Sequence, residues 1–243
     1  MADSTLLLHQ YEVSPYAAKV RRALRYKGLA FEVCNYAAAD AGKIRKTISP
    51  TGKTPVLDHE GRRIVDSTAI LRYLDEHFPT PAILPADPAL RARAHIIEDW
   101  ADESLFFYDL AMRGWPNNIE WLKRDVLSHD RGFMRWLLWR LIPKFVVKTG
   151  QAQGIGRKDR ETVCREVEAH FDAIVDLLGD GDWLVGDHIS VADIAVASMC
   201  TVIERAEEAA AMMQQRASLL AWRERVDAAT FAPGTSPEDR ATT

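Results

Sequence analysis

The sequence predicts a two-domain protein, an α/β domain followed by an all-α domain, and three observations carry this prediction. In the first 78 residues, short apolar runs suited to strands alternate with segments whose apolar side chains recur at helical spacing. Four prolines then fall within ten residues, at positions 79, 81, 85 and 88, and proline resists continuation of a helix. Beyond them the pattern is helical throughout. We therefore expect an α/β domain at residues 1–80, a linker at 79–88 and an all-helical domain at 89–243.

The N-terminal elements are expected in the order β-α-β-α-β-β-α. Strands are expected at residues 5–10, 31–35, 54–58 and 62–65, and helices at 15–27, 39–48 and 67–78. Ser14-Pro15 opens the first helix, because proline is tolerated in a first helical turn, and Gly28 ends it. Glu60-Gly61 supplies the turn between the last two strands. A right-handed crossover between the first two strands then gives a four-stranded sheet covered by helices.

The C-terminal domain is expected to be a bundle of helices. Helical patterns cover residues 89–114, 119–147, 159–178, 190–205 and 218–229, with a loop at 148–158 and a polar tail at the end. The clearest helix start is the S-x-x-D sequence at 190–193, a capping box in which serine and aspartate satisfy backbone N–H groups. We therefore assign Asp193 a structural role.

The composition and charge of the chain exclude several classes of protein. Thirty-one Lys and Arg against 35 Asp and Glu give a net charge of −4, which provides no overall attraction to nucleic acid or an anionic membrane. Three widely spaced cysteines without a C-x-x-C pair indicate neither a disulfide framework nor a zinc site. No apolar run approaches the ~20 residues of a membrane span, and the first residues lack the features of a secretion signal. We therefore expect a cytoplasmic protein that binds no metal, nucleic acid or membrane.

Two short motifs of the first domain are candidate binding elements. The K-T-P-V sequence at 53–56 places a proline directly before a strand, where a cis peptide bond can leave backbone groups free for an extended ligand. An ordinary turn explains this proline equally well. Asp66-Ser67 stands at a helix start and can be a cap alone. Alternatively, the serine and the helix end receive a carboxylate while Asp66 receives an ammonium, which together hold an α-amino acid head group.

A third motif, Ser14-Pro15-Tyr16, joins the first strand to the first helix. The N–H groups at a helix start stabilise an anion such as a thiolate, although a plain N-cap needs no such function. The same helix carries a basic run that consists of Lys19, Arg21, Arg22, Arg25 and Lys27. We interpret this run as a solvated helix face, with steering of an anionic thiol as the alternative.

The ordered set S-P-Y, K-T-P and D-S, with the proline linker and the S-x-x-D box, resembles the cytosolic glutathione transferase superfamily. Residues 5–78 resemble its thioredoxin-like N-terminal domain, and residues 190–193 resemble the capping motif of its helical domain. The resemblance implies a cytoplasmic, homodimeric glutathione transferase with glutathione as co-substrate. The glutathione site that it implies consists of Lys53, Thr54, Pro55, Val56, Asp66 and Ser67.

Each of these residues has a role that the resemblance implies. The backbone of Thr54 or Val56, beside Pro55, pairs with the cysteinyl part of glutathione, and Asp66 and Ser67 hold its γ-glutamyl head. Lys53 reaches the glycyl carboxylate, with Lys43 as a second positive charge. Two positions depart from the common pattern, because Thr54 replaces the usual valine or isoleucine and Asp66 replaces a common glutamate.

By the same resemblance, Ser14 lies beside the glutathione sulfur and is the catalytic residue. A hydroxyl there donates a hydrogen bond to the thiolate and lowers the pKa of the thiol from ~8.5 toward neutrality. A cysteine would instead form a mixed disulfide, so glutaredoxin-like reduction is disfavoured. Tyr11 and Tyr16 are the rival hydroxyls.

The second substrate is expected to be a hydrophobic electrophile that binds in the helical domain beside the sulfur. Tyr16, Tyr108 and Trp115 are the candidate residues for its binding, although most aromatic residues of this region are expected to pack in the core. Residues 115–156 are interpreted as a lid or wall over this site, or as an extended dimer surface. Asp99, Asp102 and Glu103 are candidates to reach the γ-glutamyl ammonium of a neighbouring subunit.

Two alternatives to a transferase stay open. One is a non-catalytic protein of the same fold that binds a partner or carries a ligand, and its glutathione affinity would distinguish it. The other is a glutathione-dependent isomerase, although the serine-rich motif of such enzymes is missing around Ser14.

Overall fold

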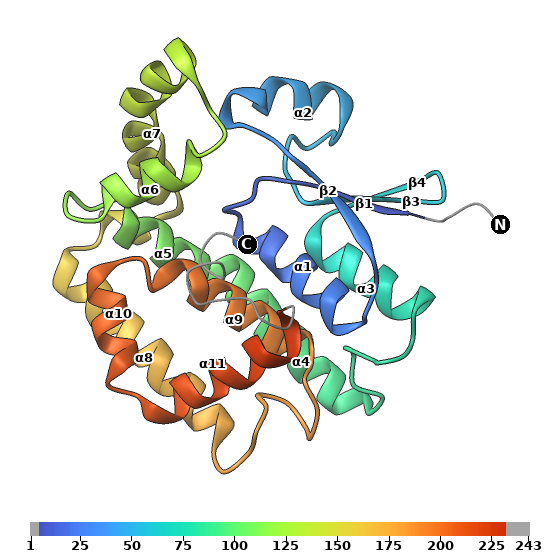
Figure 1. The fold of residues 1–243 in the computed structure, drawn as a ribbon. Coiled ribbons are helices and arrows are strands. Elements are labelled where there is room, and N and C mark those ends of the chain that lie inside the picture. The colour runs from blue at the N-terminus through green and yellow to red at the C-terminus, as the bar shows by residue number, and fades with distance from the viewer. Residues whose placement is uncertain (1–4, 232–243) are drawn as a thin grey trace.

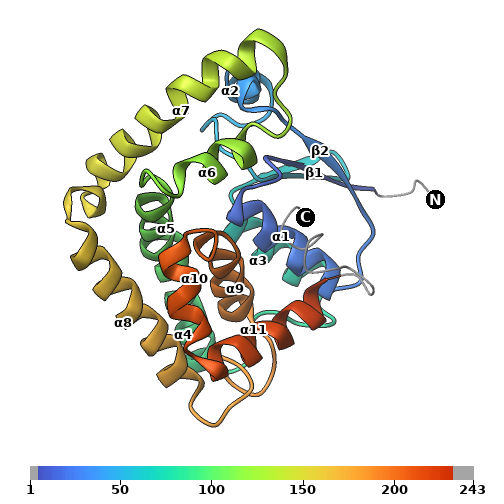
Figure 2. The ribbon, with the colours of Figure 1, turned by 60° about the vertical axis from the view of Figure 1, so that its left-hand side comes forward.

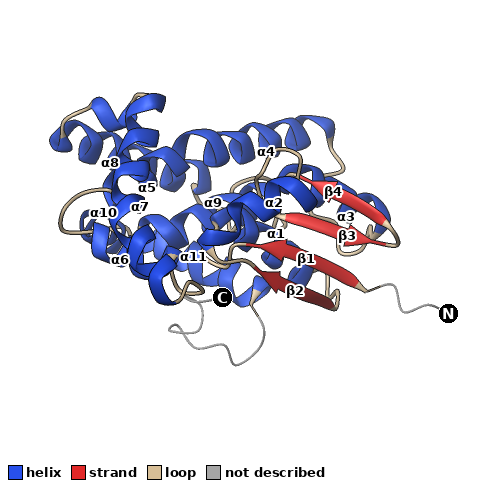
Figure 3. Cartoon of the chain, turned by 90° about the horizontal axis from the view of Figure 1, so that it is seen from above, coloured by secondary structure: helices blue, strands red, loops and turns tan. Residues whose placement is uncertain are grey.

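A four-stranded mixed sheet begins the chain in the computed structural model, which describes residues 5–231 (Figure 1). The strands are β1 (Leu6–Gln10), β2 (Phe31–Asn35), β3 (Val56–His59) and β4 (Arg62–Val65). Figure 3 shows their order β2-β1-β3-β4, in which β1 is parallel to β2 and antiparallel to β3. Leu8 of β1 stands opposite Val33 on one side and Leu57 on the other, and it is fully buried. The four predicted strands are therefore confirmed.

Three helices accompany the sheet. They are α1 (Pro15–Tyr26), α2 (Ala41–Thr47), which follows the short 3-10 turn η1 (Ala38–Asp40), and α3 (Ser67–His77). In Figure 1, α1 and α3 lie on the side of the sheet toward the C-terminal helices, and α2 lies on the opposite side. Val20 and Leu24 of α1 and Ile70 of α3 are fully buried, because their spacing places them on the helix faces toward the core.

The basic run of α1 is not a solvated face, so that interpretation was wrong. Lys19, Arg21, Arg22 and Lys27 are all buried. Arg22 forms an ion pair with Asp227 of helix α11 (Ala217–Thr230) at 2.7 Å. Lys27 pairs with Asp75 at 2.8 Å and donates to backbone carbonyls in the segment after α3. The C-terminal helices and this segment supply partners to Lys19, Arg22 and Lys27, as buried charges require. Arg21 instead donates to Gln10 and to the backbone carbonyl of Glu12.

The segment between α3 and the next helix, α4 (Pro88–Trp100), is bonded to both domains. The backbone N–H of Ile83 donates to Asp75, and the carbonyl of Ile83 accepts from Val191 at the start of helix α9 (Val191–Ile203). Among residues 5–231, every element after this segment is a helix. We propose residues 79–88 as the boundary between the two domains on this ground. The polar tail expected at the C-terminus lies mostly outside the described residues.

The C-terminal part is helical throughout, as predicted. Its elements are α4 (Pro88–Trp100), the π-helical turn η2 (Ala101–Leu105), α5 (Phe106–Arg113), α6 (Ile119–Val126), α7 (Gly132–Gln153), the 3-10 turn η3 (Ile155–Arg157), α8 (Arg160–Leu178), α9 (Val191–Ile203), α10 (Glu207–Gln214) and α11. The long helix expected at 89–114 therefore contains a π turn, and the helix expected at 119–147 is divided by a turn. Helix α10 was not predicted, although its alanines, methionines and N-terminal glutamates favour a helix.

The loop expected at residues 148–158 is partly wrong, because α7 continues through Gln153. One of its three glycines, Gly156, serves close packing. A Cβ atom on Gly156 would lie 2.6 Å from the carbonyl carbon of Gly150, so only glycine allows η3 to lie against α7 here. No described helix is long and apolar enough to cross a membrane.

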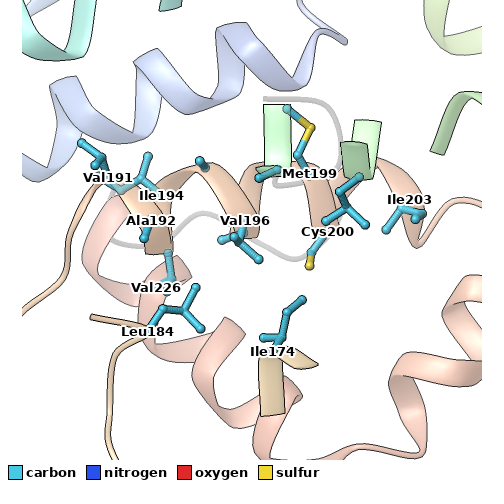
Figure 4. Close-up of a cluster of buried hydrophobic side chains, with 14 of the residues drawn as sticks. Ile174, Leu184, Val191, Ala192, Ile194, Val196, Met199, Cys200, Ile203 and Val226 are labelled. Carbon is cyan, nitrogen blue, oxygen red and sulfur yellow. The ribbon is translucent and has the colours of Figure 1, made fainter. Parts of the chain in front are cut away.

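Helix α9 lies in the middle of the hydrophobic core and is buried on every side (Figure 4). Ile174 of α8, Leu184 and Val226 of α11 pack against it. Its predicted capping box is present: the Asp193 carboxylate accepts from the Ser190 backbone N–H at 2.9 Å. Asp193 also accepts from the Leu184 N–H and the Trp222 indole N–H. Asp193 therefore fixes three segments at once, which agrees with its structural assignment.

Candidate functional site

A cavity of about 910 Å³ lies between the first domain and the helices after it. The first domain contributes the β1–α1 turn, the turn before β3 and the start of α3; the helical part contributes α4, η2, α5 and one side chain of α7. The cavity is lined by Tyr11, Ser14, Tyr16, Thr51, Gly52, Lys53, Thr54, Pro55, Val65, Asp66, Ser67, Thr68, Arg72, His95, Asp99, Asp102, Glu103, Phe106, Phe107 and Phe145. The structure thus brings together most of the predicted site residues, from Ser14 to Ser67.

Ser14 lies on the cavity wall at the N-terminus of α1. Its backbone is extended, and its hydroxyl oxygen accepts from the backbone N–H of Ala17 at 3.4 Å, so it is the N-cap of the helix. Accepting this bond leaves the hydroxyl hydrogen free to donate, because a serine hydroxyl carries one donor and two acceptor positions. A donor at a helix N-terminus is suited to stabilise an anion in the cavity.

The two rival hydroxyls differ from Ser14 in their surroundings. The Tyr16 hydroxyl donates to the backbone carbonyl of Asp102 at 2.7 Å, so its only hydrogen is already used. Burial, with the nearby Asp102 charge, holds the Tyr16 pKa far above its ordinary value. Burial and the Asp40 charge also raise the pKa of Tyr11, which makes its hydroxyl a weaker donor.

The turn before β3 presents one unpaired hydroxyl. The peptide bond between Thr54 and Pro55 is cis, as expected. The Thr54 side-chain oxygen is buried and has no hydrogen-bond partner among the described residues. Lys53 is exposed at the cavity edge, whereas Val56 is buried in β3 and does not line the cavity. The turn can therefore contribute side chains through Lys53 and Thr54.

Replacing Thr54 with valine should stabilise the protein without ligand by about 1 kcal/mol, because the change removes a buried, unpaired hydroxyl of nearly the same shape. If glutathione pairs with this hydroxyl, the gain should disappear when glutathione is bound. Thermal unfolding with and without glutathione measures both effects. Thr51→Val is the matched control: its hydroxyl already bonds Ser49 at 2.9 Å, so the same change should lower stability. A less stable ligand-free Thr54→Val protein would contradict the prediction.

The start of α3 supplies an acid and a hydroxyl in adjacent positions. Asp66 is the N-cap; its φ of 86° is in the left-handed region, which non-glycine residues rarely adopt. Its carboxylate accepts from the backbone N–H of Ala69 at 3.1 Å. Ser67, in the first helical turn, is buried on the cavity wall. A ligand carboxylate at this helix start and a ligand ammonium at Asp66 would both meet complementary charge.

A buried ion cluster supports the cavity wall behind these residues. Lys19, fully buried on α1, lies 2.8 Å from the Glu98 carboxylate of α4 and 2.5 Å from that of Asp102 in η2, and it also donates to Thr68. Burial raises the pKa of Asp102 to about 6 even though the Lys19 charge opposes this shift. The sequence identified Asp102 only as a candidate for a neighbouring subunit. Here Asp99, Asp102 and Glu103 all line the cavity of their own chain.

The apolar part of the wall comes from residues that the sequence did not select. Phe106 and Phe107 of α5 and Phe145 of α7 line the cavity. Of the three predicted electrophile-binding residues, only Tyr16 does so, and its ring packs against Phe106.

Tyr108 and Trp115 do not line this cavity. The Tyr108 hydroxyl donates to Glu166 of α8, and the Arg160 guanidinium lies over the Trp115 ring. Tyr108 follows Phe107 directly, and one residue turns a helix by ~100°, so adjacent aromatic residues face different surroundings.

The turn between α6 and α7 is fastened to the first domain. The two carboxylate oxygens of buried Asp130 accept from the backbone N–H groups of Ala38 and Ala39, at 2.9 and 3.0 Å. His129 lies 2.5 Å from Glu12, in the turn that carries Ser14. Residues 115–156 were expected to form a lid or wall over the electrophile site, or an extended dimer surface. This anchorage, together with Phe145, supports the wall.

Replacing Asp130 with alanine should release the turn between α6 and α7 from the first domain. Two charge-assisted hydrogen bonds would be lost, and we expect the free energy of unfolding to fall by about 2–3 kcal/mol. Hydrogen exchange should become faster at the amides of Ala38 and Ala39. Asp130→Asn is the control, because its single amide oxygen can still accept one bond and should leave an intermediate loss. Unchanged exchange at Ala38 and Ala39 in the alanine variant would contradict this role.

The fold and the cavity together define a class of protein. A thioredoxin-like domain presents two helix N-termini, a cis-proline turn and a free serine donor across one cavity from an apolar helical wall. Among residues 5–231, no group of His, Cys, Asp or Glu is arranged to hold a metal ion. This arrangement suits an enzyme that binds an anionic ligand beside an apolar wall.

Comparisons with known proteins agree with this class. The family model described as the N-terminal domain of glutathione S-transferase matches residues 8–82, and the model of the C-terminal domain matches residues 157–225. The chain belongs to the cytosolic glutathione transferase superfamily. Membership confirms the predicted fold, the class of enzyme and glutathione as its co-substrate.

Several relatives align along most of their length. The isoprene-epoxide glutathione S-transferase of a Rhodococcus species is 26% identical over 77% of this chain and 79% of its own. Protein LigF of a Sphingobium species is 28% identical over 83% of this chain and 80% of its own. The crystal structure of the LigF β-etherase superposes with a TM-score of 0.68 at 22% identity and covers 98% of both chains.

Proposed function

We propose that this enzyme transfers the thiolate of glutathione to a hydrophobic electrophile, with Ser14 stabilising the thiolate. One observation carries the proposal: Ser14 with its free hydroxyl hydrogen, the helix start at Asp66-Ser67 and the phenylalanine wall share a single cavity. A cavity of about 910 Å³ has room for a tripeptide and part of an apolar substrate.

Glutathione would lie along the first-domain side of the cavity. Its γ-glutamyl ammonium would meet Asp66, and its γ-glutamyl carboxylate would meet Ser67 and the α3 N-terminus. Lys53 is the cation available for the glycyl carboxylate, and Thr54 offers its unpaired hydroxyl to the cysteinyl part. These positions direct the sulfur toward Ser14 and the helix end of α1, where a negative charge is stabilised.

The electrophile would lie against Phe106, Phe107 and Phe145. The name of one relative refers to an epoxide, and the structure title of another refers to an ether. Both support a substrate whose electrophilic carbon carries a C–O bond. In such a step the sulfur forms a bond to that carbon, the C–O bond breaks, and the released oxygen takes a proton. Ser14 contributes by keeping the sulfur ionised at neutral pH.

A glutathione titration followed by the ultraviolet band of the thiolate tests the proposal. We expect bound glutathione to be ionised near neutral pH, and thiol consumption when an aryl ether or an apolar epoxide is added. The absence of glutathione binding would overturn it and favour the non-catalytic alternative. Binding without consumption of any epoxide, ether or aryl halide would overturn the transferase step alone.

The homodimer and the cytoplasmic location stay proposals that rest on the resemblance. Sedimentation velocity of the purified protein tests the first. A mass of about twice 27.3 kDa is expected.

A further inference from the structure

The outer face of α7 exposes an unusual number of apolar side chains. Figure 2 shows this helix along the outer edge of the molecule, between α2 and α8. The exposed apolar residues on it are Phe133, Met134, Trp136, Leu141, Phe145 and Val147. Phe133 and Phe145 are 73% and 70% exposed. The opposite face, with Ile142 and Val146, already packs against the neighbouring helices, so the core does not need the exposed residues.

Cations lie among these apolar side chains. Residues 131–158 contain seven Lys or Arg and no Asp or Glu. Arg140, Lys144 and Lys148 belong to none of the ion pairs formed by residues 5–231. Arg140 lies over the Trp136 ring, 4.4 Å from its centre, and Phe133 stacks on the same tryptophan. The net charge of −4 for the whole chain therefore hides a formal charge of +7 over residues 131–158, of which Lys158 is paired with Glu166.

We propose that this face of α7 docks on an anionic lipid surface. Phosphate headgroups meet the cations, and the aromatic and aliphatic side chains enter the boundary between headgroups and acyl chains. A second copy of the chain suits the face less well, because a twofold axis would bring its cations against identical cations. This mode of binding needs no membrane-spanning helix, because α7 would lie parallel to the lipid surface.

The docked orientation would also serve the cavity. Phe145 belongs both to this face and to the cavity wall, so docking brings the cavity next to the lipid. An apolar substrate dissolved in the membrane could then reach the phenylalanine wall without crossing water. This inference goes beyond the proposed transferase activity and does not depend on it.

Co-sedimentation with vesicles tests the proposal on the full-length protein. Vesicles of phosphatidylcholine alone are compared with vesicles that contain phosphatidylglycerol as one third of the lipid. We expect binding to the anionic vesicles only, and release when the salt concentration rises from about 0.05 to 0.5 M. Arg140→Glu with Lys144→Glu should weaken binding by on the order of tenfold or more.

Two further variants separate the contributions of charge and of apolar contact to vesicle binding. Arg93→Glu with Arg165→Glu changes the net charge equally on exposed residues of α4 and α8, and it should retain vesicle binding. Phe133→Ser with Trp136→Ser should weaken binding while sparing the cations. A far-ultraviolet circular dichroism spectrum and a thermal unfolding midpoint unchanged from the wild type show that each variant folds.

Three results would overturn the proposal. The first is no binding of the wild type to anionic vesicles at low salt, and the second is equal binding by both charge-reversal variants. The third is a dimer that dissociates in Phe133→Ser with Trp136→Ser, which would assign this face to a second copy of the chain. Loss of turnover in the wild type with vesicle binding intact would affect only the proposed function.

Discussion

Replacing Ser14 with alanine is expected to lower kcat/KM by on the order of a hundredfold, the loss typical of removing one donor to a developing or bound anion. Among residues 5–231 no acceptor takes this hydroxyl hydrogen on the cavity wall, while the Tyr16 hydroxyl donates its hydrogen to the carbonyl of Asp102. Without the donor, the pKa of bound glutathione should rise toward the ~8.5 of a free thiol. The thiolate absorbance of the bound peptide, followed across pH, measures this shift directly.

Loss of the cap must be separated from loss of the donor. The same substitution removes the N-cap of α1 and should cost about 1 kcal/mol of stability. Ser14→Thr keeps both functions and is the matched control, and Tyr11→Phe and Tyr16→Phe test the rival hydroxyls. If Ser14→Ala still ionises bound glutathione at neutral pH and Tyr11→Phe does not, the assignment moves to Tyr11.

Replacing Lys19 with methionine is expected to cost about 3–5 kcal/mol of unfolding free energy, because it leaves two buried carboxylates without their cation. Lys19 is fully buried between Glu98 and Asp102, and these two residues come from elements about 80 positions further along the chain. Urea unfolding near neutral pH gives the size of the loss. A loss below about 1 kcal/mol would show that the cluster contributes little to stability.

The unfolding free energy lost in Lys19→Met should become smaller as the pH falls. The folded pKa of Asp102 is about 6, above its unfolded value, so the native state binds more protons in the interval between the two. Protonation of Asp102 therefore favours the folded state as the pH falls through this interval. Without the Lys19 charge the pKa rises further, and the deficit of Lys19→Met should shrink at roughly pH 5 compared with pH 8.

A triple variant checks the cause of the loss. Lys19→Met with Glu98→Gln and Asp102→Asn removes all the charges together and should recover much of the stability, because no unpaired ion is left buried. If the triple variant is as unstable as Lys19→Met, the loss comes from packing of the lysine stem and not from the carboxylates.

The sequence by itself determined the local structure of the first domain and the positions of its binding elements. Short apolar runs indicated the four strands, Ser14-Pro15 and Asp66-Ser67 marked two helix starts, and the proline before β3 marked the turn between them. These signals are local, since capping and turn formation depend on residues within about one helical turn of each other. For the same reason the capping box of α9 was recognisable before the fold was known.

Only the tertiary structure decided the environment of side chains that pair over long distances. The basic run of α1 has the pattern of a solvated face, and its burial depends on Asp102, Asp227 and the linker, far along the chain. The π turn η2 likewise left no mark in the helical pattern, although it carries Asp102 and Glu103, two of the acids on the cavity wall. The choice of Phe106 and Phe107 over Tyr108 depends on how the helix is rotated against its neighbours. The physical reason is common to all three: burial and pairing of a side chain are set by the elements that pack around it, whereas caps and turns are completed by their sequence neighbours.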